Sequence, residues 1–344
     1  MTETDKQYLS LLKDILNNGV EKDSRAGRVK SVFGRQLRFE LKKGLPLLTT
    51  KKVFTKGVIH ELLWFLKADN NIKYLVDNNV HIWDDDAYRF YLTICNTKVK
   101  LTKEEFIEAV KRGITYAFPT EKKGFLRYYK AGDLGPIYGV QWRKQGKKQI
   151  DQIQNIIDML KTNPDDRRMI CMAWNSNEME EMALPPCHYG FQVYTRELTT
   201  CERLDWLCEH SNGEYDEWKL PTTQSLDDLN VPKRELSLMW MQRSVDYGLG
   251  WAFNLVSYSI LLSMIAQCVN MTVGEVICSL GDVHVYENHI EGLTEQLTRN
   301  PNKYNLPKLI LNQSVKNIDD FTYDDIKIEN YESYPSIKLP LSVG

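Results

Sequence analysis

The sequence around Cys187 is suited to hold a reactive side chain in a fixed position. Cys187 follows two consecutive prolines and precedes His188, and the residues at 191–195 predict a strand directly after it. Proline fixes φ and restricts the residue before it, so the thiol lies at a stiff junction between a loop and a strand. A lone cysteine is also a common buried apolar side chain. The pattern therefore allows either a structural cysteine or a nucleophile.

A second stretch favours the nucleophile. Residues 242–246 read Gln-Arg-Ser-Val-Asp and contain Arg243. An arginine close to the sulfur favours the thiolate, which is the reactive form of cysteine. His188 is then expected to play a supporting polar role rather than that of a base. Together the two stretches predict covalent catalysis through Cys187.

A carboxylate is predicted inside an apolar helix. The helix expected at 57–66 is apolar nearly all round, which is typical of a buried helix, and it carries Glu61. A buried carboxylate needs a partner or has a raised pKa. Glu61 is therefore either a paired structural residue or a general acid/base.

Four motifs resemble those of the thymidylate synthase family and occur in the same order: LPPCH at 184–188, QRSVD at 242–246, LGWAFN at 249–254 and GDVHVYENH at 281–289. The resemblance runs from about Ser24 to the C-terminus. It implies that the chain methylates dUMP at C5 with 5,10-methylenetetrahydrofolate, giving dTMP and dihydrofolate. The nucleophile would be Cys187, adding to C6 of the pyrimidine.

The resemblance also implies which residues hold the nucleotide phosphate. Arg25, within a polar loop expected at 23–28, would bind it together with Arg243 and Ser244 from the same subunit. Arg167 and Arg168 would reach it from the partner subunit of a homodimer, so that a monomer would lack a complete site.

The base and the sugar are expected to meet three other side chains. Asn254 has an amide that both donates and accepts, which suits O4 and N3–H of uracil and disfavours cytosine. His284 and Tyr286 are two apart, so they share one face of an extended segment and suit the 3′-hydroxyl. Metal ligation is not expected, because no third ligand stands at a suitable spacing.

The folate side of the site rests mainly on the resemblance. It assigns Glu61 to proton transfer at the pyrimidine, and the folate contacts to six residues: Lys51, Trp83, Asp246, Leu249, Gly250 and Val343. Trp83 precedes three aspartates, which fits a ligand-stacking rim or a half-buried core tryptophan equally well. Tyr138 lies in a glycine-bounded segment, where its hydroxyl either relays a proton or caps a turn.

These side chains require a framework of helices and strands. Hydrophobic spacing predicts helices at 7–19, 57–66 and 151–161, a strand pair within 31–41, and strands at 169–174, 191–195 and 235–244. A loop is expected at 246–254, followed by an apolar helix at 254–268. The resemblance implies an α+β fold in one domain (1–344), with a large, mostly antiparallel or mixed sheet. Helices would flank the sheet, and one face of it would pack in the dimer interface.

Two segments interrupt the family pattern. We expect a small helical subdomain at about 88–131 and a projecting segment at 196–233. Each contains a Thr-x-x-Glu capping box, starting at Thr102 and Thr199, which predicts the start of a helix. A glycine ends each predicted helix, Gly113 in the first and Gly213 in the second.

Two departures leave another product open. Residues 248–254 read Gly-Leu-Gly-Trp-Ala-Phe-Asn where the family usually reads Phe-Leu-Gly-Leu-Pro-Phe-Asn, and Gly344 extends the C-terminus by one residue. Both changes, Trp251 among them, are expected to touch the surfaces that keep water from the methylene intermediate. If water entered there, the enzyme would be a hydroxymethylase and would form 5-hydroxymethyl-dUMP and tetrahydrofolate instead. An inactive member that binds nucleotide or RNA, and a fold with incidental motifs, are the remaining alternatives.

Composition sets outer bounds on function. With 344 residues, 42% hydrophobic content and a net charge of −2, the chain can bury a large core and has no basic tract for nucleic acid. The start lacks a signal-peptide core, and 254–268 is short and polar for a membrane span. Seven scattered cysteines indicate neither a zinc site nor a disulfide framework. We expect a reduced cytoplasmic protein, in the host cytoplasm if the source is viral.

Overall fold

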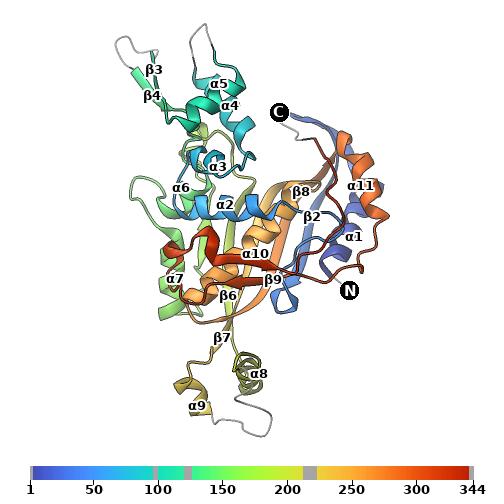
Figure 1. The fold of residues 1–344 in the computed structure, drawn as a ribbon, viewed down its shortest axis with the longest axis vertical. Coiled ribbons are helices and arrows are strands. Elements are labelled where there is room, and N and C mark those ends of the chain that lie inside the picture. The colour runs from blue at the N-terminus through green and yellow to red at the C-terminus, as the bar shows by residue number, and fades with distance from the viewer. Residues whose placement is uncertain (1–2, 96–99, 120–125, 212–222, 341–344) are drawn as a thin grey trace.

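The computed structural model describes residues 3–95, 100–119, 126–211 and 223–340. One six-stranded sheet organises them (Figure 1). All neighbouring strands are antiparallel except β7 and β8, which are parallel. The predicted combination of helices with one large mixed sheet is confirmed. In spatial order the strands are β1 (Val20–Ser24), β2 (Gly27–Glu40), β8 (Thr272–Tyr286), β7 (Arg234–Asp246), β6 (His188–Glu197) and β5 (Ile170–Met172).

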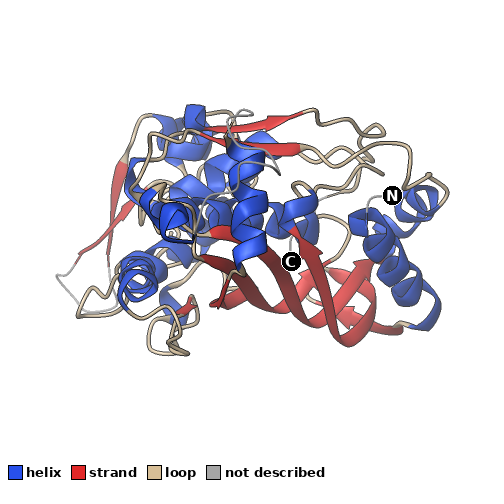
Figure 2. Cartoon of the chain, turned by 90° about the horizontal axis from the view of Figure 1, so that it is seen from below, coloured by secondary structure: helices blue, strands red, loops and turns tan. Residues whose placement is uncertain are grey.

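A buried helix, α10 (Gly250–Cys268), connects the two parallel strands, which need a crossover rather than a hairpin. It packs on β7 and β8, and α2 (Thr55–Leu66) packs on it in turn. Figure 2 shows the strands as one twisted layer with most helices on one side. At 19 residues α10 is longer than predicted and is long and apolar enough to cross a membrane, but 78% of that window is buried. It is therefore a core helix.

Several predicted boundaries near the site were wrong. Residues 23–28 are not a loop but the tip of a β1–β2 hairpin, in which Ser24 pairs with Gly27 around Arg25. The segment 31–41 is not a strand pair, because β2 continues through residue 40 and pairs along its length with β8. A long strand paired on both sides gains more hydrogen bonds than a local hairpin, which periodicity does not reveal.

Two loops were also predicted where helices begin. Tyr138 is the first residue of α6 (Tyr138–Arg143) rather than part of a glycine-bounded loop. The predicted loop at 246–254 ends early, because α10 already starts at Gly250. Asn254 therefore projects from a helix, and its direction is fixed by the helical backbone.

The segment at 88–131 is helical only in part. It begins within α4 (Asp84–Ile94) and contains α5 (Lys103–Lys111), which begins with the predicted capping box at Thr102. It also contains a two-stranded sheet of β3 (Thr115–Pro119) and β4 (Leu126–Lys130), which the prediction of a helical subdomain missed. These elements stand at one end of the long axis (Figure 1).

The second segment stands at the opposite end of the long axis (Figure 1). It contains α8 (Thr200–His210), which has the predicted capping box at Thr199, and α9 (Thr223–Asp228). Gly213 lies outside the described residues. Leu207, Leu226 and Val231 form a small hydrophobic cluster of their own.

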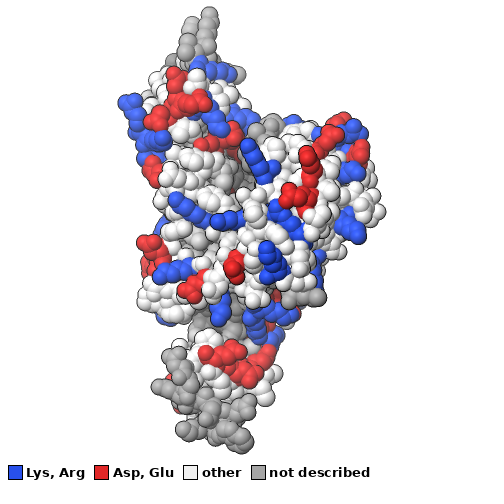
Figure 3. Space-filling model, turned by 45° about the vertical axis from the view of Figure 1, so that its right-hand side comes forward, with Lys and Arg blue, Asp and Glu red and all other residues white. Residues whose placement is uncertain are grey.

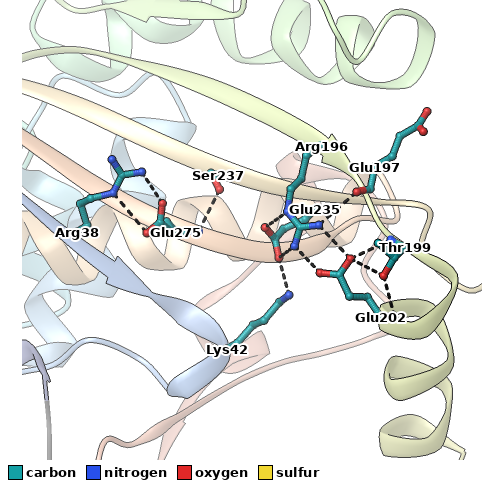
Figure 4. A network of polar contacts seen from close by, with 9 residues as sticks. All are labelled: Arg38, Lys42, Arg196, Glu197, Thr199, Glu202, Glu235, Ser237 and Glu275. Carbon is teal, nitrogen blue, oxygen red and sulfur yellow. Dashed lines mark hydrogen bonds and ion pairs between the residues drawn. The ribbon is translucent and has the colours of Figure 1, made fainter.

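Charged side chains join this second segment to the sheet (Figure 4). Arg196 on β6 forms ion pairs with Glu202 on α8 and with Glu235 on β7, and Lys42 also pairs with Glu235. Because Glu235 is nearly buried, with 11% of its side chain exposed, these pairs compensate its charge. The network therefore stabilises the base of the second segment against the body of the protein.

Figure 3 shows acidic and basic side chains interspersed over one face, without one extended basic surface. The seven cysteines, all of them in the described residues, form no disulfide. The other helices and strands are α1 (Glu3–Asn18), α3 (Lys73–Asp77), α7 (Gln152–Thr162), α11 (Ile290–Leu297), β9 (Lys308–Leu311) and β10 (Ile326–Glu329), with 3-10 turns η1 (Leu41–Lys43), η2 (Met179–Glu181), η3 (Glu287–His289), η4 (Ile318–Asp320) and η5 (Tyr323–Asp325).

Candidate active site

Arg243 holds the turn that presents the cysteine. Its backbone N–H donates to the Cys187 carbonyl at 2.9 Å. Its guanidinium donates to the carbonyls of Pro186 and Pro185, each at 2.9 Å. Prolines cannot donate hydrogen bonds, so their carbonyls are the groups through which a neighbour can fix the turn. Arg243 is thus both a structural clamp and an exposed cation beside the thiol.

The acidity of Cys187 is set by opposing effects. Burial raises the pKa of its thiol, and the positive charges of Arg243 and Arg25 act against this. Asp86 and Asp246 raise the pKa further. Arg243 thus acts in the predicted direction, favouring the thiolate, while desolvation favours the protonated thiol and has the larger effect on the pKa.

Two tyrosines and a histidine support the nucleophile from behind. The backbone N–H of Cys187 donates to the Tyr138 hydroxyl oxygen at 2.8 Å, and the Tyr138 ring stacks on His188 with the ring centroids 4.3 Å apart. His188 Nδ1 lies 2.8 Å from the Tyr258 hydroxyl. Burial lowers the pKa of His188 to about 3, so the ring is neutral. His188 is therefore an uncharged ring packed between Tyr138 and Tyr258, and the supporting role expected for it stays a prediction.

The predicted helical carboxylate has a partner. Trp83 Nε1 donates to Glu61 Oε1 at 2.7 Å. Burial raises the pKa of Glu61 to about 7, and the hydrogen bond from Trp83 opposes that rise. A carboxyl group near neutrality both gives and takes protons under ordinary conditions. Trp83 itself is buried, and its ring lies 6.0 Å from that of Tyr138.

A chain of side chains fixes the orientation of Asn254. Trp240 Nε1 can only donate, and it donates to Gln242 Oε1 at 3.2 Å. That oxygen also accepts from Asn254 Nδ2 at 2.9 Å, while Gln242 Nε2 donates to the Ser244 carbonyl at 3.0 Å. Asn254 therefore retains Oδ1 as an acceptor and one N–H as a donor. This is the pair that uracil N3–H and O4 require.

Lys51 and Asp246 meet around the start of α10. Asp246 Oδ1 accepts the backbone N–H groups of Gly248 at 2.9 Å and Leu249 at 3.1 Å. The buried Lys51 ammonium donates to the Gly248 carbonyl and to the Tyr8 hydroxyl. Burial lowers the pKa of Lys51 to about 8, and the charge of Asp246 limits that fall. These contacts place Lys51 and Asp246 on either side of one short loop.

The predicted sugar residues lie together at the end of β8. The rings of His284 and Tyr286 meet edge to face at 5.2 Å. The β7–β8 register sets His284 beside Asp246 and Ser244 beside Asp282. Burial raises the pKa of the Tyr286 hydroxyl, as it does that of Cys187, and the exposed Arg25 at the tip of the β1–β2 hairpin opposes both rises.

Other predicted residues do not join this cluster within one chain. Arg167 and Arg168 precede β5 and are exposed, and Arg168 forms an ion pair with Asp166. Leu249 and Gly250, at the start of α10, are half-buried. Val343 and Gly344 lie outside the described residues.

Trp251 differs from its expected place. It is fully buried and packs against Tyr8 at 5.4 Å, Tyr247 at 5.2 Å and Phe39 at 5.9 Å. The expectation that it changes a ligand-facing surface was wrong, because helical geometry turns its ring into the core. The departure in 248–254 therefore alters packing beneath the site.

Two supporting residues were missed from sequence. Gln242 orients Asn254, and Tyr258 contacts His188. A signal existed for both, since Gln242 precedes Arg243 in its motif and Tyr258 is one helical turn after Asn254. Neither was informative alone, because their partners lie on other elements.

The fold and site define a protein that places a cysteine thiol beside two arginine side chains, a pair of charges suited to an anionic ligand. The thymidylate synthase family model matches residues 6–343. The chain is 43% identical over 339 residues to the thymidylate synthase of Mycoplasma mobile, a match that covers 98% of the chain and 100% of that relative. It is 41% identical to that of Malacoplasma penetrans, with the same coverage, and 42% identical over 340 residues to that of Phytoplasma mali, covering 98% and 99%.

The chain belongs to the thymidylate synthase family. The predicted activity, folate-dependent methylation of dUMP, is thereby confirmed in preference to the hydroxymethylase alternative. Methylenetetrahydrofolate is its one-carbon donor.

Proposed function

We propose that Cys187 starts the reaction by adding to C6 of dUMP. The thiol loses its proton, the Sγ–C6 bond forms, and the C5=C6 electron pair moves to C5 and O4. This makes C5 a carbon nucleophile, which uracil alone does not provide. The observation that carries this role is the turn clamped by Arg243, which directs the thiol next to two cations.

Asn254 and Glu61 take complementary parts in this step. Asn254 donates to O4, where negative charge develops, and accepts from N3–H. Preorganised donors of this kind stabilise a transition state without reorganising during the reaction. Glu61 exchanges protons near the pyrimidine, which its pKa of about 7 supports. The reverse of thiol addition later breaks Sγ–C6 after C5 has lost its proton.

The phosphate and the sugar position the ring. Arg243 uses Nε and Nη2 for the proline carbonyls, and within the described residues its Nη1 makes no hydrogen bond. We assign Nη1, Arg25 and Ser244 to the phosphate, and His284 and Tyr286 to the 3′-hydroxyl. Binding energy from these remote groups orients the reacting carbon.

The folate side fits a ligand with N–H donors. Asp246 Oδ2 has no hydrogen-bond partner in the part of the chain that is described, while Oδ1 is occupied by Gly248 and Leu249. When bound, methylenetetrahydrofolate supplies the one-carbon unit and the hydride that completes the methyl group. Asp246 would accept from its pterin ring, with Lys51, Trp83, Leu249, Gly250 and Val343 completing its contacts.

The active form is proposed to be a homodimer. The sheet face opposite α10 carries exposed apolar side chains, including Tyr194 at 69% and Ile170 at 42%. Both lie on the face of Gln192, since Ile170 pairs with Gln192 and Tyr194 is two residues on. Exposed apolar groups on one face favour association. Arg167 and Arg168 would then reach the partner's phosphate.

Mixing two inactive variants tests this arrangement. Cys187→Ala lacks the nucleophile, and the double variant Arg167→Ala/Arg168→Ala lacks the phosphate pair. If the arginines act across the dimer, refolding the two together restores one intact site per heterodimer. If they act within one chain, the mixture stays inactive and the proposed role is wrong.

Product analysis tests the proposed roles as a whole. Purified protein is incubated with dUMP and methylenetetrahydrofolate, and the products are separated by mass. We expect dTMP and dihydrofolate from the native chain, and neither from Cys187→Ala. A Cys187→Ala protein that still made dTMP would exclude the proposed nucleophile.

We further propose one catalytic unit over residues 1–344, with the segments at 88–131 and 196–233 as insertions, and a cytoplasmic location. One large hydrophobic cluster, which includes residues from β2, α2, α10 and β8, supports the single unit. Subcellular fractionation of the source cells checks the location.

A further inference from the structure

His289 connects the folate side of the site with the end of the described chain. It closes η3, and its side chain is fully buried. Its Nε2 lies 2.6 Å from the carbonyl oxygen of Pro340, and its Nδ1 lies 3.8 Å from Asp246 Oδ1. A Cβ on Gly248 would lie only 2.8 Å from Nδ1. The imidazole therefore fills the space between the Asp246 loop and the chain end.

The contact with Pro340 fixes where the ring carries a proton. A carbonyl oxygen only accepts, so Nε2 carries the N–H. In the neutral ring Nδ1 is then an acceptor, and it has no hydrogen-bond partner among the described residues. It faces a second acceptor, Asp246 Oδ1. That oxygen already accepts the N–H groups of Gly248 and Leu249, so the imidazole packs against the side of the carboxylate that holds the loop.

The chain end is held at four successive places. Tyr331 donates its hydroxyl proton to the Leu48 carbonyl at 2.8 Å, and the Tyr334 N–H donates to the Thr49 carbonyl at 2.8 Å. Arg299 donates to the Pro335 carbonyl at 2.7 Å. The contact of His289 with Pro340 is the last of these along the described chain.

Apolar contacts between these anchors keep the segment close to α11. A Cβ on Gly292 would lie 2.7 Å from Ile337 Cγ2 and 3.0 Å from Leu339 Cδ2, so both side chains lie directly over this glycine. Leu339 Cδ1 would also lie 3.3 Å from a Cβ on Gly248. The segment thus packs against both α11 and the loop that carries Asp246.

We propose that His289 is a positioning residue that fixes the end of the chain against the loop of Asp246 and Gly248. Its Nε2–H holds Pro340, and its Nδ1 lies against Asp246 Oδ1, the oxygen that holds the loop through Gly248 and Leu249, so that Oδ2 is left for the folate. This role rests on the proposed function of Asp246. This role accounts for the position of the fully buried His289 beside Asp246, whose second carboxylate oxygen is proposed to bind the folate.

Three substitutions separate the two contacts. A glutamine amide reaches about as far as Nε2, and an asparagine amide lies about where Nδ1 lies. His289→Gln therefore keeps a donor for Pro340, His289→Asn keeps a polar group beside Asp246, and His289→Ala keeps neither. His210→Ala, at an exposed position on α8, is the matched control.

The first readout is hydrogen exchange at residues 334–340 in the protein without ligands. We expect exchange to become about tenfold faster in His289→Ala and His289→Asn, as for loss of one buried hydrogen bond, and to stay near native in His289→Gln. His210→Ala should not change it. Native exchange in His289→Ala, or recovery in His289→Asn and not in His289→Gln, would overturn the tether.

The second readout separates this role from the proposed chemistry. In His289→Ala the KM for folate should rise about tenfold, and more than the KM for dUMP, while Cys187→Ser loses turnover altogether.

If His289→Ala fails to fold, Gly248→Ala disturbs the same contact, because its Cβ displaces Nδ1. An equal rise in both KM values for the soluble variant would refute the positioning role. An inactive native chain would instead count against the proposed function.

Discussion

Trp83 donates its indole N–H to the Glu61 carboxylate at 2.7 Å, in a setting where burial raises the pKa of that carboxyl to about 7. Glu61 lies within α2 and Trp83 is the turn residue just before α4, 22 positions further along the sequence. The tryptophan thus stabilises the ionised form that burial disfavours. Their balance keeps Glu61 able to exchange protons near neutral pH.

Glu61→Gln should separate catalysis from stability. We expect kcat to fall by about 10²- to 10⁴-fold, as for loss of a general acid/base. The raised pKa of Glu61 means that the folded state prefers the protonated carboxyl. The stabilisation from this protonated carboxyl is complete below pH 4.5, the pKa of Glu61 in the unfolded chain. It is lost as the pH rises through about 7, its pKa in the folded chain.

The free energy of unfolding checks the sign of this effect. Glu61→Gln removes the ionised form and keeps an acceptor for Trp83. It should therefore be more stable than the native chain at pH 8, by at most about 3 kcal/mol, and equal to it at pH 4. Urea denaturation at both pH values measures the difference. A native chain that is the more stable one at pH 8 would contradict the burial of an ionisable Glu61.

Trp83→Phe should move the pH dependence of catalysis. Without the indole N–H, the ionised form of Glu61 loses a donor, so the pKa of Glu61 rises above 7. If turnover needs the ionised form, the acid limb of the kcat/KM profile shifts to higher pH. An unshifted limb in Trp83→Phe would mean that this limb reports another group.

Arg243→Ala should weaken both the nucleophile and the substrate contact. Losing the cation raises the pKa of Cys187 further, and losing the guanidinium frees the proline carbonyls. We expect slower alkylation of Cys187 by iodoacetamide at pH 8, followed by peptide mass analysis, and at least a tenfold higher KM for dUMP. Arg243→Lys should recover part of the alkylation rate, because it restores the positive charge. It should not restore the turn at Pro185 and Pro186, since one ammonium group cannot reproduce the two hydrogen bonds of the planar guanidinium.

Tyr138→Phe should loosen the nucleophile without removing it. The lost hydroxyl leaves the Cys187 backbone without its 2.8 Å partner, at a cost of about 1–3 kcal/mol. We expect a lower urea midpoint and a reduced kcat. Tyr128→Phe, at a tyrosine that is 71% exposed on β4, should change neither. Equal effects at both positions would exclude a specific role for the Tyr138 hydroxyl.

Arg203→Ala should disturb the second segment and leave the chemistry intact. Arg203 is buried and donates to Asp227 at 2.6 Å and to the carbonyls of Val231 and Pro232 at 3.2 Å. Its loss should speed hydrogen exchange within 199–211 and 223–233, because two buried carbonyls lose their donor. The kcat should stay within about twofold of native. A large loss of kcat would show that this segment supports the active site.

Sequence by itself determined the features whose causes are local. The Pro-Pro turn before Cys187, the capping boxes at Thr102 and Thr199, and the apolar helices follow from interactions within a few residues. The residue types at Cys187 and Asn254 also set which chemistry and which base are suitable. These features are encoded where they occur, so a pattern reveals them.

Tertiary structure decided what depends on partners far apart in the chain. The pairing of Trp83 with Glu61, the orientation of Asn254 by Gln242, and the contact of His289 with Pro340 arise only when separate elements pack. Burial is likewise a property of the assembled fold: it raises the pKa of Cys187, and it includes Trp251, whose side chain lies in the core. Neither desolvation nor a long-range hydrogen bond produces a periodic arrangement of residues in the sequence, and for that reason the hydrophobic pattern did not predict them.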